Sequence, residues 1–124
     1  MNPGLGELAD RYSILKLKQL RSSTPVHFED EADQILEHVI SCLATATFNS
    51  DVGMHMVTRA IELAAVNGVI WEATDSIAES MLDDDKERII GAAKTLYYKN
   101  RRRGELIHFL NELEAGKRVP KEKV

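Results

Sequence analysis

Residues 86–114 read KERIIGAAKTLYYKNRRRGELIHFLNELE. The stretch contains no proline, and its apolar residues recur every three or four positions, which is the spacing of one helix face. These apolar residues are Ile89, Ile90, Ala93, Leu96, Tyr97, Leu106, Ile107, Leu110 and Leu113. Gly116 follows closely and is a natural C-terminal cap. The pattern predicts one long amphipathic helix over residues 86–114.

Three further helical segments precede this one. We expect the first helix over residues 5–20 and the third over residues 52–81. The second should begin at a cap formed by Thr24 and Pro25 and end near residue 46. Gly68 inside the third segment lowers its helix propensity and suggests close packing or a local bend. The predicted apolar face of this third helix contains Val57, Ile61, Ala64, Ala65, Trp71, Ile77 and Met81.

Short connections between long amphipathic helices indicate an antiparallel arrangement. The sequence therefore predicts an all-α fold, an antiparallel four-helix bundle with a long C-terminal helical hairpin. We expect residues 1–116 to form one domain and residues 117–124 to form a short extended tail. The last two helices are longer than the first two, so we expect them to project as a hairpin or to pair with a second copy. A homo-oligomer, in its simplest form a dimer, follows from that expectation.

The composition narrows the class of protein. The 124 residues are 44% hydrophobic and 29% charged, as in a globular domain, and the net charge is −4. An acidic chain is a poor general binder of nucleic acid. The sequence has no signal-peptide pattern and no apolar run of the ~20 residues that span a bilayer, so we expect a cytoplasmic protein without a membrane segment. The single cysteine, Cys42, lies among apolar residues and is expected to be a small core residue.

Three polar stretches interrupt the helical patterns, at residues 5–11, 67–75 and 100–111. Each places charged or amide side chains three or four residues apart, on a shared helix face. If these faces meet, the bundle contains a charged site where a plain helical protein would have leucine. The leading hypothesis is a site for an anionic ligand such as a nucleotide or sugar nucleotide.

In this hypothesis the cationic side chains bind the anionic group of the ligand, because the guanidinium of arginine can donate two parallel hydrogen bonds to a phosphate. The candidates are Arg11, Lys18, Arg102 and Arg103. Asn67, Asn100 and Trp71 would contact neutral parts of the ligand. The carboxylates that would orient the arginines are Glu7, Asp10, Glu72 and Asp75.

Two other functions remain open on the sequence. Glu7 with Asp10, and Glu72 with Asp75, form two Glu-x-x-Asp pairs that could hold Mg²⁺, as in helical nucleotide pyrophosphohydrolases. Alternatively, the polar clusters are salt bridges that hold the helices of the bundle together, and the hairpin binds a host protein. A di-iron site is not expected, since only one Glu-x-x-His pattern occurs, at Glu105 and His108.

The joint pattern of these residues resembles a family of small helical bacterial and phage proteins to which no activity is assigned. The similarity begins with Leu5-Gly6-Glu7-Leu8, Asp10, Arg11, Ser13-Ile14-Leu15 and Lys18. It continues through Val66, Asn67, Ile70, Trp71, Glu72 and Asp75. It ends with Asn100, Arg102, Arg103, Leu110-Asn111 and, in the tail, Glu122 and Lys123. The resemblance implies an all-helical fold and a set of polar positions, with a phage origin possible.

Overall fold

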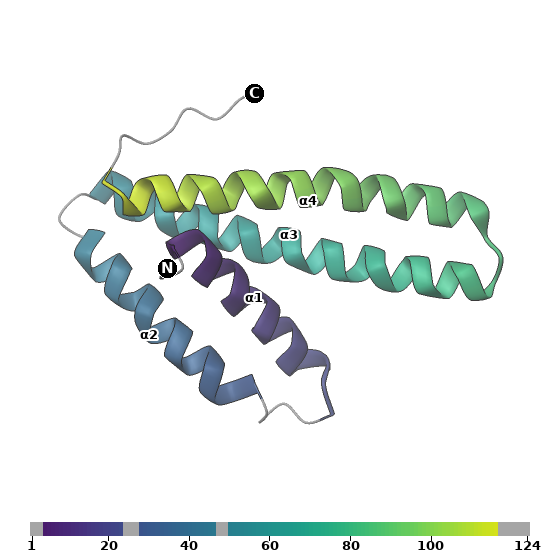
Figure 1. Ribbon diagram of the computed structural model, residues 1–124, viewed down its shortest axis with the longest axis horizontal. Helices are drawn as coiled ribbons and strands as arrows, with labels where there is room; N and C mark the ends of the chain where they lie inside the picture. The colour runs from purple at the N-terminus through teal and green to yellow at the C-terminus, as the bar shows by residue number, and fades with distance from the viewer. Residues whose placement is uncertain (1–3, 24–27, 47–49, 117–124) are drawn as a thin grey trace.

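The computed structural model describes residues 4–23, 28–46 and 50–116, and over these residues the chain forms four helices and no strand (Figure 1). The helices are α1 (Leu5–Arg21), α2 (Glu29–Ala46), α3 (Ser50–Leu82) and α4 (Lys86–Glu114). The predicted all-α bundle is confirmed, and the bounds of α4 are as predicted. The proposed cap at Thr24 and Pro25 and the tail with Glu122 and Lys123 lie outside the described residues.

The helices α3 and α4 form a long antiparallel hairpin (Figure 1). Its turn is residues 83–85, where Asp84 adopts a positive φ of 54°. The side chain of Asp85 caps α4 by accepting a hydrogen bond of 3.1 Å from the Arg88 amide. At the other end of α4, Gly116 has a φ of 75°, the left-handed conformation that ends helices and favours glycine.

One end of this hairpin is covered by α1 and α2, and the other end projects beyond them (Figure 1). The main core lies where α1, α3 and α4 meet, and it contains Leu5, Leu63, Leu106, Leu110 and Leu113, each almost completely buried. A second cluster joins α1 to α2 through Leu8, Leu15, Ala32 and Ile35. None of the described helices has both the length and the apolar character needed to cross a bilayer.

The predicted apolar face of α3 is wrong. Val57, Ile61 and Met81 are 44%, 65% and 67% exposed, whereas Met56 and Leu63 are buried. The sequence of α3 is apolar on several sides, so its periodicity does not single out the face that packs. The packed face follows from where α1 and α4 lie, which is a tertiary property. The part of α4 nearest the turn also differs from the prediction, since the predicted core residues Ile90 and Tyr97 are 56% and 65% exposed.

Close packing occurs at Gly6 rather than at Gly68. A Cβ atom added to Gly6 would lie 2.1 Å from the carbonyl oxygen of Ile107, so the backbones of α1 and α4 touch there. A Cβ atom at Gly68 would meet nothing within 4 Å. The close packing expected at Gly68 is therefore wrong, and α3 is one continuous helix through it.

Candidate functional site

The polar centre of the bundle is Asp10, which is only 7% exposed at the meeting point of α1, α3 and α4. From α4, Arg103 donates two hydrogen bonds to it, from Nε to Oδ1 at 2.8 Å and from Nη2 to Oδ2 at 2.6 Å. From α3, Asn67 donates from Nδ2 to Asp10 Oδ1 at 2.9 Å and to Ser13 Oγ at 2.6 Å. The Ser13 hydroxyl donates in turn to the Asp10 carbonyl at 2.8 Å. One carboxylate thus ties three helices together.

This network is neutral as a whole. The hydrogen bonds with Asp10 raise the pKa of Arg103 above its ordinary value, against the opposing effect of burial. A buried carboxylate is costly unless its oxygens are paired, and both oxygens of Asp10 are paired here. Arg103 is therefore committed to Asp10 rather than free to hold a ligand.

A second cluster caps the start of α1. The first amides of a helix have no partner within it, and α4 supplies the partners here. Asn111 Oδ1 accepts from the Gly6 amide at 2.7 Å, and Glu114 Oε1 accepts from the Leu5 amide at 2.9 Å. Asn111 also donates from Nδ2 to Glu7 Oε1 at 3.0 Å. The carboxylate of Glu114 near the positive end of α1 favours this docking further.

The same carboxylate faces Cys42 on α2. The thiol donates to Glu114 Oε2 at 3.3 Å. Burial, and next the hydrogen bond and negative charge of Glu114, raise the pKa of Cys42. Cys42 is partly buried and packs against the main core, which agrees with the predicted core role.

A third cluster lies at the other end of α1. Arg21 forms ion pairs with Glu72 and, at 3.5 Å, with Asp75 on α3. Its guanidinium carbon also lies 5.5 Å from the centre of the Trp71 ring. Sequence reasoning missed Arg21 because it lies outside the three polar stretches. The available signal was its position four residues after Leu17, on the face that packs.

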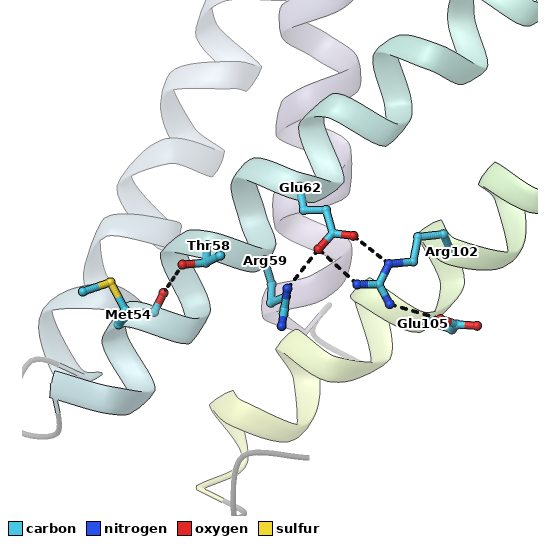
Figure 2. A network of polar contacts seen from close by, with 6 residues as sticks. All are labelled: Met54, Thr58, Arg59, Glu62, Arg102 and Glu105. Atoms are coloured by element: carbon cyan, nitrogen blue, oxygen red, sulfur yellow. Dashed lines mark hydrogen bonds and ion pairs between the residues drawn. The ribbon is translucent and has the colours of Figure 1, made fainter. Parts of the chain in front are cut away.

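A fourth cluster links α3 to α4 on another side of the hairpin, and Figure 2 shows its members. Arg102 donates to Glu62 from Nε at 2.7 Å and from Nη2 at 3.0 Å, and Arg59 donates to the same carboxylate at 3.0 Å. The hydrogen bond from Arg102 is the main cause that lowers the pKa of Glu62. Arg102 also donates to Glu105 at 3.2 Å. Although adjacent in sequence, Arg102 and Arg103 thus serve separate clusters.

A groove opens between α1, α3 and α4 beside the Asp10 network. Its volume is about 290 Å³. It is lined by Ile14 and Leu17 of α1, Arg103 of α4, and Asn67, Ile70, Trp71, Thr74 and Asp75 of α3. Four of the predicted site residues, Asn67, Trp71, Asp75 and Arg103, therefore share one groove. Since Asn67 donates both amide hydrogens to the network, its carbonyl oxygen is the group left for a ligand.

The remaining predicted residues lie elsewhere. Arg11 pairs with Glu31 of α2 at the surface. Lys18 and Asn100 are exposed, and their side chains bond to no other described residue. The two acidic pairs do not converge on one point. Glu7 and Asp10 accept hydrogen bonds from Asn111 and Arg103 of α4, whereas Glu72 and Asp75 both pair with Arg21 of α1. Among residues 4–23, 28–46 and 50–116, no three His, Cys, Asp or Glu side chains are grouped as metal ligands would be.

No protein-family model, no curated protein and no solved structure matches the chain. The resemblance to the helical bacterial and phage family therefore stays a prediction, and the function is argued from the geometry alone.

Proposed function

We propose that this protein is a cytoplasmic ligand-binding protein whose groove between α1, α3 and α4 holds the base of a nucleotide or sugar nucleotide. The supporting observation is that the groove gathers Trp71, Asn67 and Asp75, which were predicted to contact a ligand or to orient its partners. An indole offers a flat surface for a base to stack on. The carbonyl of Asn67 and the carboxylate of Asp75 are acceptors for the amino and imino hydrogens of a base.

The size and lining of the groove limit the ligand. About 290 Å³ is at the lower end of small-molecule sites, so only one ring system of a larger ligand would be enclosed. The walls from Ile14, Leu17 and Ile70 are apolar, which suits the faces of a ring rather than a phosphate. The charged part of a nucleotide would then extend past the rim.

The cations for that charged part are Arg21 and Lys18 rather than Arg102 or Arg103. Arg21 lies over Trp71 at the edge of the groove, and its carboxylate partners are more than half exposed, so a phosphate can replace them. Lys18 is exposed and lies four residues after Ile14, on the rim side of α1. Arg103 is held by the buried Asp10, and Arg102 belongs to the Glu62 cluster.

A structural role is the second candidate. It is favoured by the fact that Arg11, Arg21, Arg102 and Arg103 each already pair with a carboxylate of another helix. In that case the clusters act as staples of the bundle, and the hairpin serves to bind another protein. The Mg²⁺-dependent hydrolase has no observation in its favour, because its four carboxylates are spread over separate contacts.

The single tryptophan of the chain lies in the groove, so its fluorescence reports binding there directly. We expect AMP, UMP or UDP-glucose to quench Trp71 fluorescence and to raise the melting temperature, with inorganic phosphate alone giving much less. Adding Mg²⁺ tests the hydrolase alternative in the same assay through release of phosphate or pyrophosphate.

A blocking variant and a matched control sharpen this test. Thr74→Arg fills the groove, whereas Thr58→Arg places the same side chain elsewhere on α3. Both threonines are exposed, and each donates to the carbonyl four residues earlier, at 2.9 and 2.8 Å (Thr58 in Figure 2). Binding should be lost in Thr74→Arg and kept in Thr58→Arg. If no nucleotide changes the fluorescence or stability of the unmodified chain, the groove hypothesis is wrong and the structural role takes its place.

A further inference from the structure

The far half of the α3–α4 hairpin, next to the turn at residues 83–85, is not covered by α1 or α2 (Figure 1). Thr74 lines the groove on the side where α1 packs. Ile77 and Met81 follow Thr74 at three and seven residues, so they continue the same side of α3 beyond the end of α1. On α4, Leu96 and Ala93 precede Arg103 by seven and ten residues and continue that side in the same way.

Large apolar side chains are exposed along this part of the hairpin. Met81 of α3 and Tyr97 of α4 are each about two-thirds exposed, and Ile90 is more than half exposed. The sequence periodicity predicts these three residues as core positions. We define the far apolar face as Ile77, Met81, Ile89, Ile90, Ala93, Leu96 and Tyr97. Large apolar side chains left exposed together in one region typically mark an interaction site.

The charges on the hairpin indicate what covers the face. Residues 79–87, at the turn, contain five acidic residues and one basic residue. Residues 94–103, farther along α4, contain five basic residues and no acidic one, and three of the five, Lys94, Lys99 and Arg101, lie outside the Asp10 and Glu62 clusters. Two copies placed antiparallel would bring the acidic turn of each opposite the basic segment of the other. A two-fold axis repeats this match at both ends, whereas parallel copies would oppose like charges.

We propose that the far apolar face is a homodimer interface in which a second copy of this chain lies antiparallel, so that two hairpins form a four-helix bundle. Ile90 and Ala93 lie between the acidic and the basic segments, close to the two-fold axis, and Tyr97 lies one turn farther along α4, within the basic segment. Small Ala93 at this position lets the two α4 helices approach, and Ile90 and Tyr97, one turn to either side of it on α4, fill the space beside it. The interface completes the burial that α1 and α2 provide only at the other end of the hairpin.

The first test is the mass in solution, measured by sedimentation or by light scattering after size exclusion. The unmodified chain should have twice its 13.9 kDa mass, and Tyr97→Glu should have the mass of one chain. Met54→Glu is the matched control, because Met54 is 68% exposed, close to the 65% of Tyr97, but lies at the other end of α3. A single-chain mass for the unmodified protein, or a dimer unaffected by Tyr97→Glu, would overturn the proposal.

A charge-reversal experiment tests the antiparallel alignment. One variant carries Asp83→Lys and Glu87→Lys at the turn, and the other carries Lys94→Glu and Arg101→Glu along α4. In each variant alone, the substituted residues oppose like charges at both ends of the interface and the charge match between the two segments is lost, so each should be monomeric. An equal mixture restores opposite charges at both ends and should form a heterodimer. If the mixture stays monomeric, or if either variant alone dimerises as well as the unmodified chain, the antiparallel dimer is wrong.

Discussion

Arg103 donates two hydrogen bonds to Asp10 across 93 positions of sequence, at 2.6 and 2.8 Å, and Asp10 is almost completely buried. The contact joins the first helix to the last one. Asn67 adds a contact from α3 to the same carboxylate, so the position of one side chain depends on three helices at once.

Removing Arg103 should destabilise the fold strongly, because it leaves the Asp10 charge buried without its cation. We expect Arg103→Ala to lower the free energy of unfolding by about 3 kcal/mol, as for other broken buried pairs. Urea unfolding at neutral pH measures this. Arg11→Ala is the control, since the exposed Arg11–Glu31 pair should be worth less than about 1 kcal/mol. Equal losses of stability in both variants would show that the Asp10–Arg103 pair contributes no more to folding than an exposed ion pair.

A methyl group at Gly6 should separate α1 from α4, because it would overlap the Ile107 carbonyl. Gly6→Ala should therefore cost about 3 kcal/mol of stability despite the better helix propensity of alanine. In contrast, Gly68→Ala should gain roughly 0.5–1 kcal/mol, since nothing lies near its added Cβ. Thermal unfolding of the two variants compares them. A Gly6→Ala chain as stable as the unmodified protein would contradict the close contact.

The Arg102–Glu62 contact should make stability depend on pH in acid. The hydrogen bond from Arg102 lowers the pKa of folded Glu62 below its ordinary value of about 4.5. The contribution of the pair to stability is therefore complete above that value and is lost as the pH falls through the lower, folded pKa. We expect Glu62→Gln to reduce the urea midpoint at neutral pH and to converge with the unmodified chain in strong acid. Glu37→Gln, at an exposed position of α2, should show no such convergence.

Ser80 should be a residue whose replacement stabilises the hairpin. It is 0% exposed, and its hydroxyl has no hydrogen-bond partner among the described residues. Ser80→Ala removes this unpaired group and improves helix propensity, so we expect a gain of about 1 kcal/mol. Ser76→Ala, one turn earlier and only partly buried, isolates the propensity effect. A loss of stability in Ser80→Ala would mean that the hydroxyl has a partner, such as a bound water.

The sequence determined the helices because their signals are local. Apolar spacing, the cap at Gly116 and the lack of proline in residues 86–114 are read from neighbouring residues, and the bounds of α4 follow from them. The polar stretches also contained Asp10, Asn67 and Arg103 as candidate site residues, since their polar side chains recur three or four residues apart on a helix face.

Tertiary structure decided which faces pack and which polar residues meet. The sequence of α3 is apolar on several sides, so only the positions of α1 and α4 select Leu63 over Ile61 for the core. Arg102 and Arg103 differ in role because successive side chains on a helix point about 100° apart, toward different neighbours. Three contacts depend on helix crossings set by Gly6: Arg103 with Asp10, Asn111 with the start of α1, and Arg21 with Trp71. No local sequence pattern encodes the distances between these helices.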